Sequence, residues 1–192
     1  MVTAGAGVML FALVARPEPW WQGYVSEAGT AGQAYAGIYR LGLIVLALGV
    51  ALLGWALPRA GLLLLVAAVL AGTSSLVPCS SQCPLPPYEP TTPADLVHAT
   101  PSILGMAVLA AAMALTWSTN ARPAIRWLTA ATLTLTVPLG AALGLMMLFA
   151  GRGTTSALLE RILLVVDVSW LVGTALLTTF NGDASRRRTS PR

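Results

Sequence analysis

Long apolar stretches without a charged side chain constrain this chain more than any other feature of its sequence. Residues 41–57, for example, contain no Asp, Glu, Lys or Arg. A helix needs about 20 apolar residues to cross a hydrocarbon core of ~30 Å. Charged residues make up only 9% of the chain, whereas a soluble domain carries about 25%. The sequence therefore predicts a polytopic membrane protein, and the continuous rather than alternating apolar runs indicate helices.

Six apolar segments predict an all-α membrane bundle with six transmembrane helices. The segments cover residues 2–15, 34–57, 60–77, 95–117, 127–150 and 158–180. The first is short, since a helix of its length spans only about 21 Å, and we expect a thin first helix. Residues 1–180 are predicted to form a single transmembrane domain, followed by a disordered basic tail over residues 181–192.

Arginine residues set the predicted orientation, because cytoplasmic loops carry an excess of positive charge. With the N-terminus inside, the cytoplasmic segments hold Arg59, Arg122, Arg126 and the four arginines of the tail, whereas Arg16, Arg152 and Arg161 lie outside. Both termini are therefore predicted to be cytoplasmic, in the inner (plasma) membrane of the cell. Nucleic-acid binding is not expected, because no folded basic face accompanies the tail.

The segment "PCSSQCPLPPYEPTTPADLVHATP", residues 78–101, gathers both cysteines and the only histidine of the chain. Its prolines favour an extended cover over a helix. On the outer side Cys79 and Cys83 meet an oxidising compartment, where a disulfide persists. A disulfide is favoured; free thiols or metal ligation together with His98 are the alternatives. We expect no metal site, since zinc normally takes three or four protein ligands, and no cofactor.

Several polar residues are predicted to lie at one depth near the outer surface. Asp95 and His98 fall in the first turn of the fourth helix, whereas Arg40 and Asp167 lie about 8–10 Å below the surface at ~1.5 Å per residue. A charge in hydrocarbon costs at least ~2.5 kcal/mol, so these groups should pair or face a water-filled pocket. The remaining candidates for the wall of that pocket are Ser26, Glu27 and Arg161.

Acid–base or hydrolytic chemistry is the reaction class that these residue types would support. In that scheme His98 or Glu27 acts as the base, Asp95 orients His98, and Arg40 with Arg161 binds an anionic group. The structural interpretations stay open beside it. Arg40 and Asp167 would form an ion pair between helices, Asp95 would cap its helix, and His98 would hydrogen-bond Asp95.

Small residues in the fifth helix are predicted to serve close helix packing. Gly140 and Gly144 are four residues apart, as in small-xxx-small patterns, and Thr132, Thr134 and Thr136 precede them.

Four stretches of the chain resemble a bacterial membrane family labelled domain of unknown function 998. They are "GYVSEAG", "YAGIYRLGL", the "CSSQCPLP" and "DLVH" region, and "LLERILLVVDVSW". The resemblance implies a six-helix membrane bundle but no activity. The positions that match its motifs are Ser26, Glu27, Arg40, Asp95, His98, Glu160 and Arg161.

Two hypotheses about function follow. The first is a protein with an outer polar pocket that carries out acid–base or hydrolytic chemistry on a lipid or other amphipathic molecule. The second is a non-enzymatic binding, sensing or scaffold protein in which the charged cluster locks the helices together. A transporter ranks below both, because the inner halves of the helices offer no charged residue. The lipid bilayer is the expected partner in every case.

Overall fold

The computed structural model is all-helical and describes residues 1–188, with side chains described as far as Thr179. Its helices are α1 (Val2–Val14), α2 (Ala36–Ala56), α3 (Gly61–Leu76), α4 (Pro93–Thr119), α5 (Pro123–Phe149) and α6 (Thr154–Arg188), with a short 3-10 helix, η1 (Val25–Gly29), between α1 and α2. All six predicted helices are present. α6 continues past the predicted end near residue 180 as far as Arg188, and residues 189–192 of the predicted tail lie outside the described residues.

Four of these helices, α2, α4, α5 and α6, are long and apolar enough to cross a membrane. α1 has 13 residues and α3 has 16, so at 1.5 Å per residue they measure only about 20 and 24 Å. The chain is therefore a multi-pass membrane protein by the length and composition of its helices.

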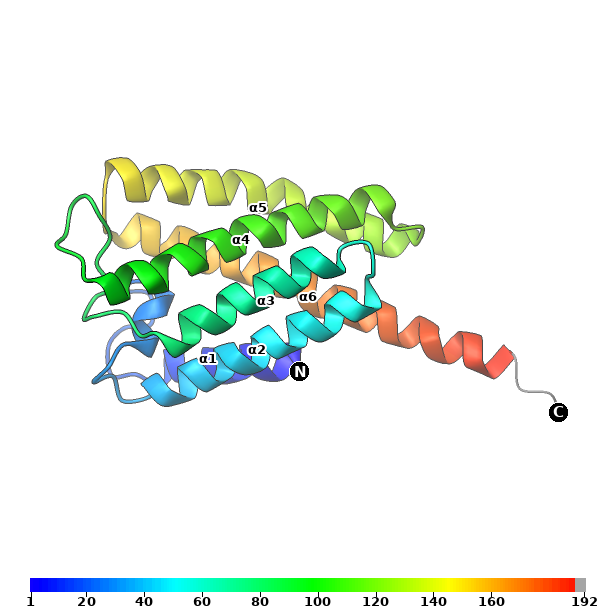
Figure 1. Cartoon of the computed structure of the whole chain (residues 1–192), viewed down its shortest axis with the longest axis horizontal. Helices are drawn as coiled ribbons and strands as arrows, with labels where there is room; N and C mark the ends of the chain where they lie inside the picture. The colour runs from blue at the N-terminus through cyan, green and yellow to red at the C-terminus, as the bar shows by residue number, and fades with distance from the viewer. Residues whose placement is uncertain (189–192) are drawn as a thin grey trace.

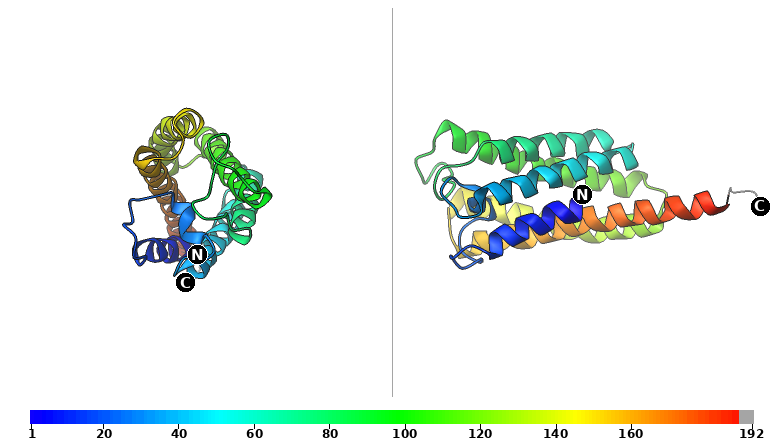
Figure 2. Two further views of the ribbon diagram at one scale, coloured as in Figure 1. Left: turned by 90° about the vertical axis from the view of Figure 1, so that its left-hand side faces the viewer. Right: turned by 90° about the horizontal axis from the view of Figure 1, so that it is seen from below.

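Consecutive helices pack side by side (Figure 1). The last helix, α6, also contacts the first, α1. The longer connections, 15–35 and 77–92, meet at one end of the bundle, and the C-terminal part of α6 projects from the other end (Figures 1 and 2). We call the first of these the loop end. It contains most of the polar residues that the sequence singles out.

Apolar side chains from α2, α3, α4 and α6 form the larger core. Leu64, Met113 and Trp170 are fully buried there. Trp170 also donates its indole N–H to Thr129 Oγ1 of α5 at 2.8 Å, so its one polar group is satisfied. A second, smaller core joins α1, η1 and α2 near the loop end, around Ala12, Val25 and Tyr39.

Glycines let α1 and α2 pack with their backbones in contact. A Cβ atom on Gly5 would lie 2.4 Å from the backbone nitrogen of Leu46, and one on Gly49 would lie 2.7 Å from that of Val2. The predicted role of Gly140 and Gly144 is wrong, because a Cβ on Gly140 would meet only Leu163 at 4.0 Å and one on Gly144 would meet nothing within 4 Å. Small residues allow close helix approach only where a partner helix faces them.

Candidate functional site

The polar residues of the loop end form two clusters. One, the α6 cluster, joins the start of α6 to the loop between α1 and α2. The other, the His98 cluster, joins the start of α4 to the end of α3 and to the loop that carries the cysteines. The members of the α6 cluster are Tyr24, Glu27, Arg152, Ser156, Glu160 and Arg161. The members of the His98 cluster are Arg40, Ser74, Ser80, Thr92, Asp95, His98 and Ser102.

Arg161 is the centre of the α6 cluster. Its guanidinium is buried and donates to backbone carbonyls throughout. Nε and Nη2 bind the carbonyl of Trp20 at 2.9 and 2.6 Å, Nη2 also binds that of Gln22 at 3.3 Å, and Nη1 binds those of Gly23 and Ala157 at 2.8 Å each. A guanidinium has five N–H donors. All five are engaged, so Arg161 has none left for the anion that the sequence-based scheme assigns to it.

Two carboxylates fix η1 in the same cluster. Glu160 accepts the backbone N–H of Val25 at 2.7 Å. Glu27 accepts the N–H of Tyr24 at 2.8 Å and forms an ion pair with Arg152, the one ion pair among side chains of residues 1–179. Gly23 must be glycine here, because its φ is +67° and a Cβ would lie 2.3 Å from the Glu27 carboxylate. Ser26 lies half-buried on η1 beside Glu27.

Tyr24 closes this cluster from the loop side. Its hydroxyl donates to Ser156 Oγ at 3.3 Å, and burial raises the pKa of its phenol above the usual value of 10. A cavity between Tyr24, Glu89 and Arg152 has a volume of about 10 Å³, which is room for about one water molecule. A larger hollow of about 370 Å³ lies away from both clusters, between Trp55, Pro58 and Leu62 of the α2–α3 hairpin.

Asp95 caps α4 in the His98 cluster and also holds the cysteine loop. Its carboxylate accepts the N–H and the hydroxyl of Thr92 at 2.8 and 2.7 Å, and those of Ser80 at 2.6 and 3.0 Å. Thr92 is the N-cap residue and its hydroxyl accepts the Asp95 N–H in return, which is a capping box. The predicted hydrogen bond between Asp95 and His98 is absent. The carboxylate is occupied on the loop side, and His98 turns toward α3 instead.

His98 is held by α3 through one ring nitrogen. Nδ1 lies 2.9 Å from the carbonyls of Ser74 and Val77 and 3.2 Å from Ser74 Oγ. Carbonyl oxygens only accept hydrogen bonds, so Nδ1 carries a proton, and in the neutral imidazole the lone pair is then on Nε2. Nε2 is buried and has no hydrogen-bond partner among the described residues. Ser102 completes the cluster by bonding Ser74 Oγ at 2.7 Å.

Arg40 and Asp167 do not form the predicted ion pair. Arg40 donates to the carbonyls of Ser75 and Leu76 at 2.8 and 3.1 Å, where the unpaired carbonyls at the end of α3 attract a cation. Asp167 lies further along α6, buried, and accepts the hydroxyl of Thr136 on α5 at 2.7 Å. Its second oxygen has no partner within the part of the chain that the structure describes. Arg40 therefore caps the C-terminal end of α3, and Asp167 forms part of the contact between α5 and α6.

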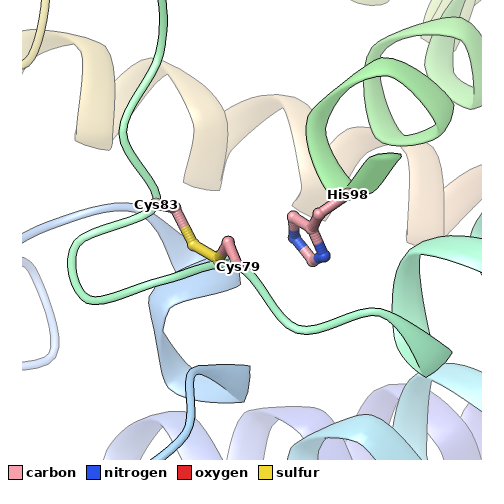
Figure 3. Close-up of side chains that lie close together, drawn as sticks. All are labelled: Cys79, Cys83 and His98. Atoms are coloured by element: carbon pink, nitrogen blue, oxygen red, sulfur yellow. A yellow bond between two sulfur atoms is a disulfide. The ribbon is translucent and has the colours of Figure 1, made fainter. Parts of the chain in front are cut away.

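Cys79 and Cys83 form a disulfide in the structure, with their Cα atoms 5.0 Å apart. Both are buried in the loop after α3. His98 lies beside the bridge, with its ring turned toward the two sulfurs (Figure 3). The closest available ligand atoms of the three residues lie within 4.8 Å of one another.

A comparison with protein families matches residues 2–177 to the family described as "Protein of unknown function (DUF998)". The chain belongs to this family. No curated protein matches the chain, and no solved structure matches it. In this DUF998 member, the family motifs quoted above contribute Glu27, Glu160 and Arg161 to the α6 cluster and Arg40, Asp95 and His98 to the His98 cluster.

Some members of both clusters are not among the residues that the sequence singles out as a site. Arg152 precedes α6 and Ser156 lies in its first turn. Only the tertiary structure brings them into contact with Glu27 of η1 and with Tyr24, its N-cap residue. Ser80 and Thr92 bind Asp95, and here a signal exists. Thr92 and Asp95 have the Thr-x-x-Asp spacing of a capping box before an apolar run. In this DUF998 protein the spacing marks the start of α4.

Proposed function

We propose that this chain crosses the membrane six times, with α1 and α3 as short crossings and both termini on the cytoplasmic side. The positions of the arginines support this orientation. Arg59, Arg122 and Arg126 lie in or next to the connections at the end opposite the loop end, as the positive-inside rule expects of the cytoplasmic side. An even number of crossings then returns the C-terminus to the side of the N-terminus, in the plasma membrane of a bacterial cell.

Reporter fusions test this topology. A cytoplasmic fluorescent reporter and a periplasmic phosphatase, each fused after Trp55, Glu89 or Trp117, should show fluorescence at the first and third sites and phosphatase activity at the second. Phosphatase activity after Trp55 would contradict a crossing by α2 in this direction. If the same reporter were active after both Trp55 and Glu89, α3 would not cross the membrane.

We propose further that the protein acts by binding, sensing or scaffolding, and that its outer polar residues lock the loops onto the helices. Arg161 carries this proposal, because all five of its donors bind backbone carbonyls. The carboxylates follow the same pattern. Asp95, Glu27 and Glu160 each accept backbone N–H groups, so these residues satisfy buried backbone rather than present free groups to a substrate.

Acid–base chemistry on an amphipathic molecule is the second candidate function, and one observation favours it. Nε2 of His98 is buried and has no partner in residues 1–179, and a neutral imidazole nitrogen in this position could act as a general base. The geometry supports this candidate less well, since Asp95 does not orient the ring and Glu27 is paired with Arg152.

Mass analysis of molecules that co-purify with the protein separates the two candidates. Wild type, His98→Ala and Arg161→Gln would be extracted in native lipid and compared. The lock predicts that Arg161→Gln loses thermal stability while His98→Ala leaves the bound molecules unchanged. A discrete molecule that is chemically altered or lost in His98→Ala, with stability preserved, would overturn the lock and support catalysis.

A further inference from the structure

Cys79, Cys83 and His98 together have the composition of a metal-ligand set. Two sulfurs and one imidazole nitrogen lie within 4.8 Å of one another, and all three side chains are buried (Figure 3). The residues come from two elements, the loop after α3 and the first turns of α4, so the tertiary structure assembles the set. We propose that, once the disulfide is reduced, these three residues bind one thiophilic metal ion, Cu(I) in preference to Zn(II).

The hydrogen bonds of His98 are those of a metal ligand. A histidine that binds a metal through one nitrogen donates its other N–H to a carbonyl or carboxylate, which fixes the tautomer and the ring orientation. Nδ1 of His98 does this toward the carbonyls of Ser74 and Val77. The lone pair of Nε2 is then directed away from α3, and no described residue satisfies it. A buried nitrogen without a hydrogen-bond partner is available as a ligand.

Asp95 supports the set from outside. Its carboxylate holds both the N–H and the hydroxyl of Ser80, the residue next to Cys79. His98 stands on the same helix, three residues after Asp95. The loop that carries the cysteines is therefore tied to the helix that carries the histidine, whether or not the sulfurs are bonded to each other. The lock itself does not depend on the metal, so this inference goes beyond the proposed function.

The redox step is a balanced exchange with a dithiol reductant. The two thiols of the reductant become a disulfide, the S–S bond between Cys79 and Cys83 breaks, and two electrons and two protons pass to their sulfurs. Binding of the ion to both sulfurs and to Nε2 of His98 then releases these two protons, because thiolates are the ligands. Ligands at about 2.3 Å from one ion lie roughly 4 Å apart, so the two sulfurs must move apart once their bond is broken, while the imidazole nitrogen already lies within 4.8 Å of both.

The number and kind of ligands decide the metal. Soft thiolates select Cu(I) and zinc over harder ions. Structural zinc takes four protein ligands, and the carboxylate of Asp95, which holds the same loop, already accepts four hydrogen bonds. Three ligands with two thiolates therefore favour Cu(I).

An anaerobic competition titration tests the site. The full chain, purified in nanodiscs, would be reduced with a phosphine, freed of it, and titrated with Cu(I) against a chromophoric Cu(I) chelator. Reduced wild type should bind one equivalent. Oxidised wild type should bind at least ~10-fold more weakly, as should reduced His98→Gln, since loss of even an outer-shell partner costs 10–100-fold. X-ray absorption of the reduced complex should show two sulfurs and one nitrogen around copper.

Controls and opposing outcomes are built into the same titration. The oxidised protein carries no substitution, so its weaker binding cannot come from a destabilising mutation. Ser118→Ala, at the exposed far end of α4 and outside both clusters, should bind as wild type. The proposal fails if reduced wild type binds no more tightly than Cys79→Ser/Cys83→Ser, or if His98→Gln matches wild type in affinity and spectrum. Tighter binding of Zn(II) than of Cu(I) would overturn the choice of metal.

Discussion

Arg161 holds Trp20 by two hydrogen bonds to a single carbonyl, from Nε at 2.9 Å and from Nη2 at 2.6 Å. The two residues are 141 positions apart in the chain. The contact ties the start of α6 to the loop between α1 and α2, and a planar guanidinium is the side chain that can make it. The stability of the loop end should therefore depend on Arg161 more than on the neighbouring charges.

Arg161→Gln should lower the free energy of unfolding by about 3 kcal/mol, because four carbonyls, one buried and three part-buried, lose their donor and a buried acceptor left unpaired costs about 1–3 kcal/mol. Arg152→Gln is the matched control. Its ion pair with Glu27 is partly exposed, and such pairs contribute about 1 kcal/mol or less. Denaturant titration of both variants in mixed micelles measures the difference. Equal losses would show that the buried guanidinium has no special role.

Gly5→Ala should weaken the packing of α1 on α2, since the new Cβ would lie 2.4 Å from a backbone nitrogen of α2. Gly7→Ala is the control on the same helix, where a Cβ meets nothing within 4 Å. Gly7→Ala should be neutral or stabilising by up to ~1 kcal/mol, as alanine favours helix. Thermal unfolding of the two variants compares them. A Gly5 variant as stable as the Gly7 variant would contradict the backbone contact.

Asp95→Asn should loosen the cysteine loop, because an amide that accepts through one oxygen cannot hold both Ser80 and Thr92 as the carboxylate does. We expect the free energy of unfolding to fall by about 1–2 kcal/mol, as when a helix cap is removed. Cys79 and Cys83 should also be alkylated faster in the reduced protein. Ser102→Ala should leave the alkylation rate unchanged. Unchanged alkylation in Asp95→Asn would show that the loop is held by other contacts.

Tyr24 should make stability depend on pH in the alkaline range. Burial raises the pKa of its phenol above 10, so the folded state favours the protonated form. This contribution to stability is fully present below pH 10 and is lost as the pH rises through the folded-state pKa. Tyr24→Phe should flatten the fall in unfolding free energy above pH 10, measured by denaturant titration at several pH values. An unchanged slope would assign the pH dependence to other groups.

Much of the fold follows from the sequence because apolar runs encode helices directly. The uncharged stretches predict all six helices, and the start of α4 is marked by the Thr92–Asp95 capping box. Helix packing is less predictable. The Gly140 and Gly144 pair has the expected spacing, yet the close contact is made by Gly5 and Gly49, since spacing within one helix does not specify which face meets a neighbour.

The sequence predicts many residues of the candidate site but not which residues they contact. Depth along the helices brings Arg40, Asp95, His98 and Asp167 to neighbouring levels, but a shared depth leaves the rotation of each helix open. In the structure Arg40 turns to the end of α3 and Asp167 to Thr136. Each is held by a neighbouring element rather than by the other, and the second oxygen of Asp167 has no partner among the described residues.

The sequence alone determined that this is a helical membrane protein, because long uncharged runs such as residues 41–57 satisfy their backbone hydrogen bonds in a bilayer as helices. It also placed the cysteines, His98 and Asp95 in one loop and the helix that follows it. Only the tertiary structure decided which of these groups meet. Asp95 binds the loop, and His98 donates its Nδ1–H to α3 with its ring turned toward the two sulfurs, because each buried polar group takes the partner that packing brings within reach.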